Sequence, residues 1–502
     1  MRITETDRLL CLLSDSLETL IFPELQSQRA QATVDFIRLT LAELRKREND
    51  TPALLHEEIL AGQQQLLAAQ SLLARLDAAH HAPAASVAVA AHSLFDALVR
   101  EHADLTEALA QTTLALQRAR STAKPEDQDN ISALLLQAAQ WEERYGRRQR
   151  EQPCPPPPPR EADASTGPLR AETLQAFLRT QHPHGDAVSV THFEAIPGGF
   201  GKQTTLFTLR DGAGCERDLI ARKMDPAPLV STGLFNIERE FHLLQSLSAT
   251  GYPAPTPLYL GSNVAGIDAP FYVMERLPGK VTGSYLSGMR STPSEALLFD
   301  IAAQMARLHT MPLAALSGYI DRYEDPALLT TLRVRDCYAA KLAEMRRYQL
   351  EEVEHLPSPT LTYLADWLQR QMPADDRRPV LVHGDFNIHN LLIDGDRVSG
   401  VLDWECAMFG APEQELAYIQ PHISQLIDWE RFIAHYEHCA QRKIDRATMA
   451  YYLAFSMFPV NIAMNRGVRN VQSGLNRDAR YLMIELAYGP QFLQMALAAT
   501  NP

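Results

Sequence analysis

Apolar side chains in the first 150 residues recur at the spacing of helix faces. Leucines and isoleucines stand three and four positions apart over residues 9–21 and 66–76, which is the repeat of one side of an α-helix, and three leucines at residues 134–136 lead to Trp141. Glycine occurs only twice in this part of the chain, as suits uninterrupted helices. The pattern predicts an all-α N-terminal domain over residues 1–150, with the leucines in its core.

A proline-rich segment follows this region. Residues 151–169 contain five consecutive prolines, from Pro155 to Pro159. Proline has no backbone donor, and runs of it favour the stiff polyproline II conformation. The segment therefore predicts a semi-rigid linker between two folded bodies.

After the linker the pattern changes to short β-rich segments separated by glycine-containing turns. The first three segments predict antiparallel strands, and an apolar stripe then predicts a helix over residues 234–249. Two further strands precede Pro278-Gly279. The predicted strands cover residues 188–195, 202–210, 217–224, 256–261 and 271–277.

From about residue 295 onward most segments have a helical pattern, interrupted by one β-like island at residues 378–405. Strands followed by helices are the order of an α+β protein, not of a repeating βαβ sheet. We therefore predict a strand-rich lobe over residues 170–279 and a helix-rich lobe over residues 280–502.

Composition narrows the class of protein. The 502 residues are 46% hydrophobic and 22% charged, with a formal net charge of −14, which disfavours a protein that coats nucleic acid. Six cysteines lie far apart without a C-x-x-C pair, as expected for reduced thiols. The chain has no run of 18 uncharged apolar residues and no secretory pattern at its start. We expect a cytoplasmic protein with neither a membrane-spanning helix nor a nucleic-acid partner.

The candidate chemistry lies in the β-like island. A short apolar strand, Val380–Val382, leads to Asp385 and Asn390, and a second strand, Val398–Leu402, leads to Asp403. Oxygen-bearing side chains therefore stand at the exits of short buried strands. Mg²⁺ prefers such oxygen ligands, with one or two carboxylates and room for phosphates.

The spacing H-x-D-x-x-x-x-N, followed by an Asp-bearing strand, resembles the aminoglycoside phosphotransferase and choline kinase group of small-molecule kinases. Within that group the island is most similar to the kinase modules related to those fused to acyl-CoA dehydrogenases. The resemblance covers about residues 185–490 and implies a two-lobed protein-kinase-like fold after the helical domain. Further segments that resemble the family, in order, are residues 198–203, 220–223, 239–241, 273–279 and 306–309.

The resemblance also implies roles for individual residues. Asp385 would be the catalytic base, and Asn390 and Asp403 would hold Mg²⁺ against the phosphates of ATP. A third-strand cation, held by Glu240, would meet the phosphates. Such roles suit phosphoryl transfer, which needs positioning and charge neutralisation more than covalent chemistry. The implied nucleotide-binding residues are Gly198, Gly199, Gly201, Lys202, Arg222 or Lys223, Glu240, and the backbone of Glu275 and Leu277 for adenine.

Two positions depart from the family pattern or leave a choice. Arg222 and Lys223 are adjacent, and successive strand residues point to opposite faces, so only one can face the nucleotide; the preceding apolar pair favours Arg222. Glu415 stands where the family usually has Asp, which leaves open whether it supports the catalytic loop. His383 is interpreted as bracing that loop through hydrogen bonds, and His309 and His389 as packing or polar-contact residues.

The implied activity is an ATP- and Mg²⁺-dependent phosphotransferase acting on a small-molecule hydroxyl. Residues 411–502 carry eight acidic and eight basic side chains, which disfavours a polycationic aminoglycoside and leaves a hydroxy acid or hydroxyacyl compound as the favoured acceptor. An aminoglycoside-type antibiotic kinase and a catalytically idle nucleotide-binding scaffold remain alternatives, and ATP against GTP stays open. The N-terminal helices either form a homodimer, cover the cleft or bind a partner.

Overall fold

The chain divides into two compact units. The bundle unit draws on Met1–Ala162, Met345–Gln371 and Met457–Pro502, and the sheet unit on Asp163–Glu344 and Met372–Ser456. The computed structural model describes residues 10, 13–14, 17–22, 25, 28–49, 51–76, 94–151, 169–182, 185–196, 201–224, 236–284, 288–289, 292–351, 356–472, 484 and 488–500.

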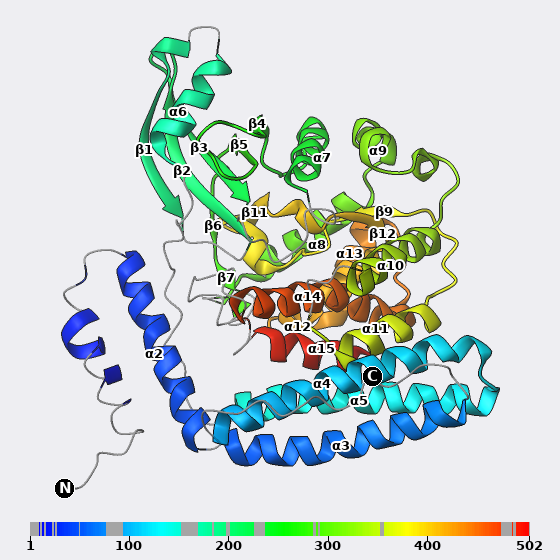
Figure 1. The fold of residues 1–502 in the computed structure, drawn as a ribbon. Coiled ribbons are helices and arrows are strands. Elements are labelled where there is room, and N and C mark those ends of the chain that lie inside the picture. Colours follow the sequence, from blue (N-terminus) through cyan, green and yellow to red (C-terminus); the bar gives the residue numbers. More distant parts are fainter. Residues whose placement is uncertain are drawn as a thin grey trace, which may run out of the picture. The chain divides into compact units, whose positions relative to one another are not determined.

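Long helices make up the bundle unit, and α3, α4 and α5 run alongside one another (Figure 1). A core cluster that includes Leu109 and Trp141 lies between them. The indole N–H of Trp141 donates to the carbonyl oxygen of Glu58 at 2.7 Å, which satisfies the polar atom of this buried ring. The predicted helical character of the N-terminal region is confirmed. The helices of this unit include α2 (Gln28–Asn49), α3 (Thr51–Arg75), α4 (Leu94–Ala119), α5 (Pro125–Glu151), α11 (Pro359–Arg370) and α15 (Gly489–Thr500).

Two helices from far along the sequence, α11 and α15, belong to this bundle. α11 packs against α4 and α5, and α15 packs against α5. Glu142 of α5 accepts the backbone N–H of Thr360 at 2.8 Å and so satisfies a donor at the start of α11. Arg120 donates to Asp366 at 2.6 Å. The compact units therefore differ from the predicted lobe of residues 280–502, because α11 buries its side chains against the N-terminal helices.

A five-stranded antiparallel sheet opens the sheet unit, in the order β1-β2-β3-β5-β4. The predicted strands are all present, and α7 (Ile237–Ala249) follows β3 as predicted. Asn236 caps α7 by accepting the N–H of Glu238. The strands are β1 (Ser189–Ile196), β2 (Lys202–Arg210), β3 (Glu216–Met224), β4 (Pro257–Gly261) and β5 (Phe271–Glu275).

The two faces of this sheet belong to different hydrophobic clusters. One face, with Phe207 and Leu219, packs with residues of α6 (Ala171–Thr180). The other face, with Leu206 and Ile220, packs with residues of α7. Because side chains alternate along a strand, this register decides which face each residue of β2 and β3 meets.

Helices and short strand pairs form the rest of the sheet unit, as an α+β order predicts. The short strands carry the candidate chemistry at their ends: β9 (Val380–Val382) pairs with β12 (Met408–Gly410), and β10 (Leu391–Asp394) pairs with β11 (Arg397–Val401) and with β6 (Lys280–Val281). The helices that lie wholly in this unit after the sheet are α8 (Glu295–His309), α9 (Ser317–Tyr323), α12 (Pro412–Ile423) and α13 (Trp429–Ala440). The helices α10 (Val334–Glu351) and α14 (Met449–Gln472) begin in this unit and end in the bundle unit.

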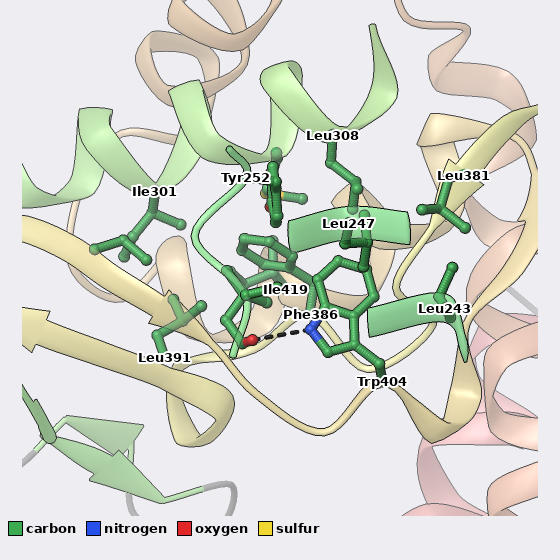
Figure 2. Close-up of a cluster of buried hydrophobic side chains, with 14 of the residues drawn as sticks. Leu243, Leu247, Tyr252, Ile301, Leu308, Leu381, Phe386, Leu391, Trp404 and Ile419 are labelled. Carbon is green, nitrogen blue, oxygen red and sulfur yellow. Dashed lines mark hydrogen bonds between the residues drawn. The ribbon is translucent and has the colours of Figure 1, made fainter. Parts of the chain in front are cut away.

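Figure 2 shows the core that lies beneath the island. Phe386 and Trp404, the residues that follow Asp385 and Asp403, are buried in it together with Leu308 of α8. The indole N–H of Trp404 donates to the carbonyl oxygen of Val401 at 2.9 Å. These anchored aromatic side chains fix the backbone on which the two aspartates stand.

One apolar stretch is long enough to be compared with a membrane span. Among the described helices, Arg446–Asn470, which contains most of α14, has an 18-residue window with a mean hydropathy of 1.2. This window is 61% buried within the structure, and core helices share its composition. The expected absence of a membrane-spanning helix stays a prediction.

Candidate active site

The catalytic loop leaves β9 and closes on itself through Asp385 and Asn390. The amide nitrogen of Asn390 donates to Oδ2 of Asp385 at 2.9 Å and to its carbonyl oxygen at 3.0 Å. Oδ1 of Asp385 is buried and forms no hydrogen bond of normal geometry with the described residues. Asn390 thus holds one carboxylate oxygen in place, and the hydroxyl of Tyr418 on α12 also acts on this carboxylate.

Gly384 is required by the close packing of this loop. Its φ of +80° lies in the left-handed region that favours glycine, and a Cβ atom there would collide with the carbonyl oxygen of Cys406. A glycine before Asp385 therefore lets the loop approach the segment after β11.

His383 and Glu415 brace the loop from inside. The carboxylate of Glu415 on α12 accepts the backbone N–H groups of His383 and Gly384, the latter at 2.9 Å. Its other oxygen bonds to Nε2 of His309 at 2.8 Å, and the opposite ring nitrogen of His309 bonds to the hydroxyl of Tyr436 at 2.7 Å. The longer Glu side chain thus does reach the catalytic loop, which settles the question that the departure from the family's Asp left open.

His383 also connects the catalytic loop to the strand that carries Asp403. Its Nδ1 accepts the backbone N–H of Asp385 at 3.2 Å, so its Nε2 carries the proton and donates to the carbonyl oxygen of Leu402 at 2.8 Å. The N–H of Leu402 donates to the carbonyl oxygen of Asn390 at 2.9 Å. These bonds bring the candidate base and the two candidate metal ligands to one place. The predicted bracing role of His383 is confirmed.

Asp403 follows β11 in the left-handed conformation, with a φ of +66°. Such a conformation costs free energy for a residue with a Cβ and concentrates at functional sites. With Asn390 it offers oxygen donors of the kind that Mg²⁺ prefers. Within the described ranges no group of three or more His, Cys, Asp or Glu side chains could hold a metal. A cation here would therefore need phosphate and water oxygens to complete its coordination.

Arg222 faces this site and Lys223 does not. Nη2 of Arg222 donates to Oδ1 of Asp403 at 3.0 Å. Lys223 is fully buried on the opposite face, where its ammonium contacts Asp268 at 2.6 Å. The sheet register explains the difference, because Arg222 has the parity of Ile220 on the α7 face and Lys223 has that of Leu219. Arg222, the preferred residue of the two, is therefore the one on the face of Asp403, and its contact with the nucleotide stays a prediction.

Glu240 holds a different cation from the one predicted. Its Oε2 lies 2.7 Å from Nζ of Lys202 on β2. The cation that it contacts is therefore on the second strand, whereas Arg222 stands on the third. Its Oε1 accepts the backbone N–H of Trp404 at 3.1 Å. Lys202 reaches Glu240 because β2 pairs with β3 in a register that puts Lys202 opposite Met224, on the same face as Arg222. The expected pairing of the third-strand cation with Glu240 was therefore wrong.

Lys202 has further acidic neighbours. Its Nζ lies 2.7 Å from Oε2 of Glu405 and 3.4 Å from Oδ1 of Asp403. From the sequence alone the role of Glu405, near the candidate metal ligands, stays open. Its position two residues after Asp403 was the only signal that could have pointed to it.

Burial and charge shape the ionisation of these groups. Burial raises the pKa of a carboxyl group, but Arg222 and Lys202 outweigh this effect and hold the pKa of Asp403 well below its usual range. Burial also acts on Asp385, yet the charge of His389, whose Nε2 lies 3.4 Å from Oδ2, leaves the pKa of Asp385 below its ordinary value. Burial raises the pKa of Glu405, against the opposing effect of Lys202. Both aspartates are thus ionised at neutral pH.

The expected nucleotide-binding turn and hinge are only partly described. Gly198 and Gly199 lie outside the described residues. Gly201, just before β2, has a φ of +89° and open space where a Cβ would stand. The N–H of Glu275 donates to the carbonyl oxygen of Thr256 at 2.9 Å, and the half-buried Leu277 lies beyond the end of β5. The contact of Glu275 and Leu277 with adenine stays a prediction.

Sequence comparison gives relatives that are much longer than this chain. The chain is 29% identical over 267 residues to acyl-CoA dehydrogenase family member 11 of Rattus norvegicus, a match that covers 52% of this chain and 31% of the relative. It is 30% identical over 206 residues to acyl-CoA dehydrogenase family member 10 of Mus musculus, covering 40% of this chain and 18% of that protein. The chain thus matches less than a third of the length of either relative.

Solved structures also resemble the chain. A crystal structure from Ralstonia eutropha, assigned to the aminoglycoside phosphotransferases, is 23% identical with a TM-score of 0.47, covering 66% of this chain and 98% of that one. The aminoglycoside phosphotransferase APH(4)-Ia in complex with ADP and hygromycin B is 17% identical with a TM-score of 0.38, covering 66% and 99%.

The match to a known family covers more than half of the chain. Residues 192–452 match the phosphotransferase enzyme family, and they include the sheet from within β1 onward, the catalytic loop and the segment with Asp403. The predicted two-lobed fold, strand-rich and then helical, is that family's fold. The chain belongs to the phosphotransferase enzyme family.

Proposed function

We propose that the chain is an ATP- and Mg²⁺-dependent kinase of a small-molecule hydroxyl group. The observation that carries the proposal is the meeting of Asp385, Asn390 and Asp403 in one hydrogen-bonded site with Arg222 and Lys202 beside it. A base, oxygen ligands for a metal and fixed cations are the parts that phosphoryl transfer requires.

The donor groups fit ATP and Mg²⁺. Asn390 and Asp403 would hold the metal, which supplies neutralisation of the phosphate charge. Arg222 uses Nη2 on Asp403, while its Nε is buried and has no partner among the described residues. A buried donor without an acceptor is costly, and a phosphate oxygen would satisfy it.

Asp385 would act on the acceptor hydroxyl. As the hydroxyl oxygen bonds to the γ-phosphorus, the bond from that phosphorus to the leaving oxygen of ADP breaks and the hydroxyl proton passes to the carboxylate of Asp385. A carboxylate with a lowered pKa is a weak base, so its main work is to orient the hydroxyl and to receive the proton late. Asn390 and His383 hold Asp385 in position for this work.

We infer a hydroxy acid or hydroxyacyl compound as the acceptor. Both relatives carry the name of acyl-CoA dehydrogenases, so a kinase region within such proteins fits an acyl chain that bears a hydroxyl group. The balanced charge of residues 411–502 gives no excess of carboxylates for a polycation. An assay should therefore begin with hydroxy acids and hydroxyacyl compounds and turn to aminoglycosides after them.

The test is an ATP-consumption assay with hydroxy acids, hydroxyacyl-CoA thioesters and aminoglycosides as acceptors, and with GTP in place of ATP. We expect turnover with a hydroxyacyl compound that Asp385→Asn abolishes while nucleotide binding persists. Asp394→Asn, an exposed aspartate of the same island, serves as the matched control. Turnover confined to aminoglycosides would support the antibiotic-kinase alternative. Nucleotide binding without turnover on any acceptor would favour the idle scaffold.

A further inference from the structure

Lys202 sits among carboxylates from separate elements. Its side chain is 8% exposed, and Nζ lies 2.7 Å from both Glu240 of α7 and Glu405, with Asp403 at 3.4 Å. An ammonium group has three donors, and three carboxylates surround this one. Each of its donors therefore already faces an anion of the protein itself.

Arg222 differs from Lys202 in this respect. It contacts Asp403 through Nη2 alone, and its Nε is buried without a partner in the described part of the chain. A guanidinium has five donors in a planar fork, so Arg222 can keep Asp403 and still bind a phosphate with two parallel bonds. Of the two cations, only Arg222 has a donor to spare.

Glu240 links Lys202 to the segment that carries Asp403. One of its oxygens meets Lys202 and the other accepts the N–H of Trp404, so its carboxylate joins β2 to the residue after Asp403. Glu405 adds a second contact between Lys202 and that segment. Lys202 thus connects the strand after the glycine-containing turn, the helix α7 and the Asp403 segment.

We propose that Lys202 is a positioning residue that fixes these three elements to one another, and that Arg222 alone among the two cations binds the nucleotide phosphates. The inference rests on the proposed function in that it takes this site to be the nucleotide site. The cation that Glu240 holds thus stands at the start of the second strand and not on the third.

The first test needs no nucleotide. Lys202→Met, Glu405→Gln and the double variant are unfolded with urea, and the pair Arg210→Met and Glu216→Gln, an exposed ion pair on β2 and β3, is the matched control. If the two side chains act through their mutual contact, the double variant should have nearly the same urea midpoint as the less stable of the two single variants. In the control pair the two losses of stability should add. Additive effects of Lys202→Met and Glu405→Gln on the free energy of unfolding would overturn the proposed positioning role of Lys202.

The second test measures ADP binding without Mg²⁺ by calorimetry. Removing a charge-assisted bond to phosphate weakens binding by about tenfold or more, so Arg222→Met should lose that factor. Lys202→Met and Glu405→Gln should share one smaller change and lower kcat more than they raise KM for ATP. If Lys202→Met instead greatly lowers the affinity for ADP while Glu405→Gln leaves that affinity unchanged or raises it, Lys202 is a phosphate contact and the proposal is wrong.

The two tests separate the inference from the function on which it rests. A wild-type protein that binds no nucleotide would contradict the proposed function, and with it the assignment of Arg222. The urea experiment would in that case still decide whether Lys202 and Glu405 are coupled in the folded protein.

Discussion

The carboxylate of Glu415 accepts the backbone N–H groups of His383 and Gly384, the two residues immediately before Asp385. It is 1% exposed and also bonded to His309. A buried carboxylate on α12 thus fixes the backbone of the candidate catalytic loop, and its removal would leave those N–H groups without a partner.

Glu415→Ala should therefore reduce both stability and turnover. Removing one partner of a buried charged contact costs about 3–5 kcal/mol, so we expect that loss in the free energy of unfolding together with a large fall in kcat. Urea unfolding and steady-state kinetics measure the two quantities. Glu430→Ala, an exposed glutamate on the neighbouring α13, should change neither. A Glu415→Ala variant with normal kcat would show that the loop does not depend on this brace.

The neighbours Arg222 and Lys223 provide an internal comparison. Arg222→Met should weaken nucleotide binding by about tenfold or more, because Arg222 faces Asp403, whereas Lys223→Met should retain it, because Lys223 faces Asp268 on the other side of the sheet. The exposure of Asp268 limits the stability loss in Lys223→Met to about 1 kcal/mol. Binding of ADP to the two folded variants is the measurement. Equal losses in both would contradict the assignment of the faces.

Much of this site could be predicted from the sequence, because the motif residues lie close together along the chain. Asp385, Asn390 and Asp403 stand at the ends of short strands within one island, and the apolar pair before Arg222 favoured that residue over Lys223. The pairing of Lys202 with Glu240 could not be predicted in this way. It depends on the register between two strands and on the position of α7, which no local pattern fixes.

Contacts between distant parts of the chain could not be predicted in the bundle unit either. The apolar spacing predicted the N-terminal helices, but not that α11 and α15 pack with them. Those contacts join residues more than two hundred positions apart, as Arg120 and Asp366 illustrate. Local periodicity shows that a helix has an apolar face and does not say which helix covers it.

The packing of α11 predicts the behaviour of a shortened chain. A fragment of residues 169–502, which lacks α2 to α5, would expose the side chains of α11 that α4 and α5 bury, and would leave Asp366 without Arg120. We expect this fragment to be less soluble and to melt at a lower temperature than the full chain. A fragment with the solubility and melting temperature of the full chain would contradict the account of the bundle unit.

A milder variant tests the same contact within the full chain. Glu142→Ala should lower the free energy of unfolding by about 1–3 kcal/mol, since it leaves the N–H of Thr360 at the start of α11 unpaired. Glu126→Ala, an exposed glutamate in the first turn of the same helix, is the control. Urea unfolding of both variants decides whether the contact stabilises the protein.

His389 gives a pH-dependent prediction. Burial lowers the pKa of its imidazole, but Asp385 more than offsets this effect, so the pKa lies above the ordinary value of 6.5. The ion pair is therefore complete below pH 6.5 and is lost as pH rises through the higher folded-state pKa. Wild type should exceed His389→Gln in unfolding free energy by more at pH 6 than at pH 9. A difference that is independent of pH would show that His389 is not charged in the folded protein.

The same variant should alter the pH profile of turnover. Without the imidazolium, the pKa of Asp385 rises, so the acidic limb of kcat/KM should move to higher pH in His389→Gln. His435→Gln, a histidine on α13, provides the control. An unchanged acidic limb would mean that a group other than Asp385 governs it.

The central claim is that Asp403 belongs to a site for Mg²⁺ and a nucleotide, and the most direct measurement is thermal unfolding with ATP in the presence and absence of Mg²⁺. A ligand that binds only the folded state at 100 times its dissociation constant adds about 2.7 kcal/mol of stability. We predict a rise in melting temperature with ATP that depends on Mg²⁺ and disappears in Asp403→Ala. No rise in the wild-type protein, or an equal rise in Asp403→Ala, would contradict it.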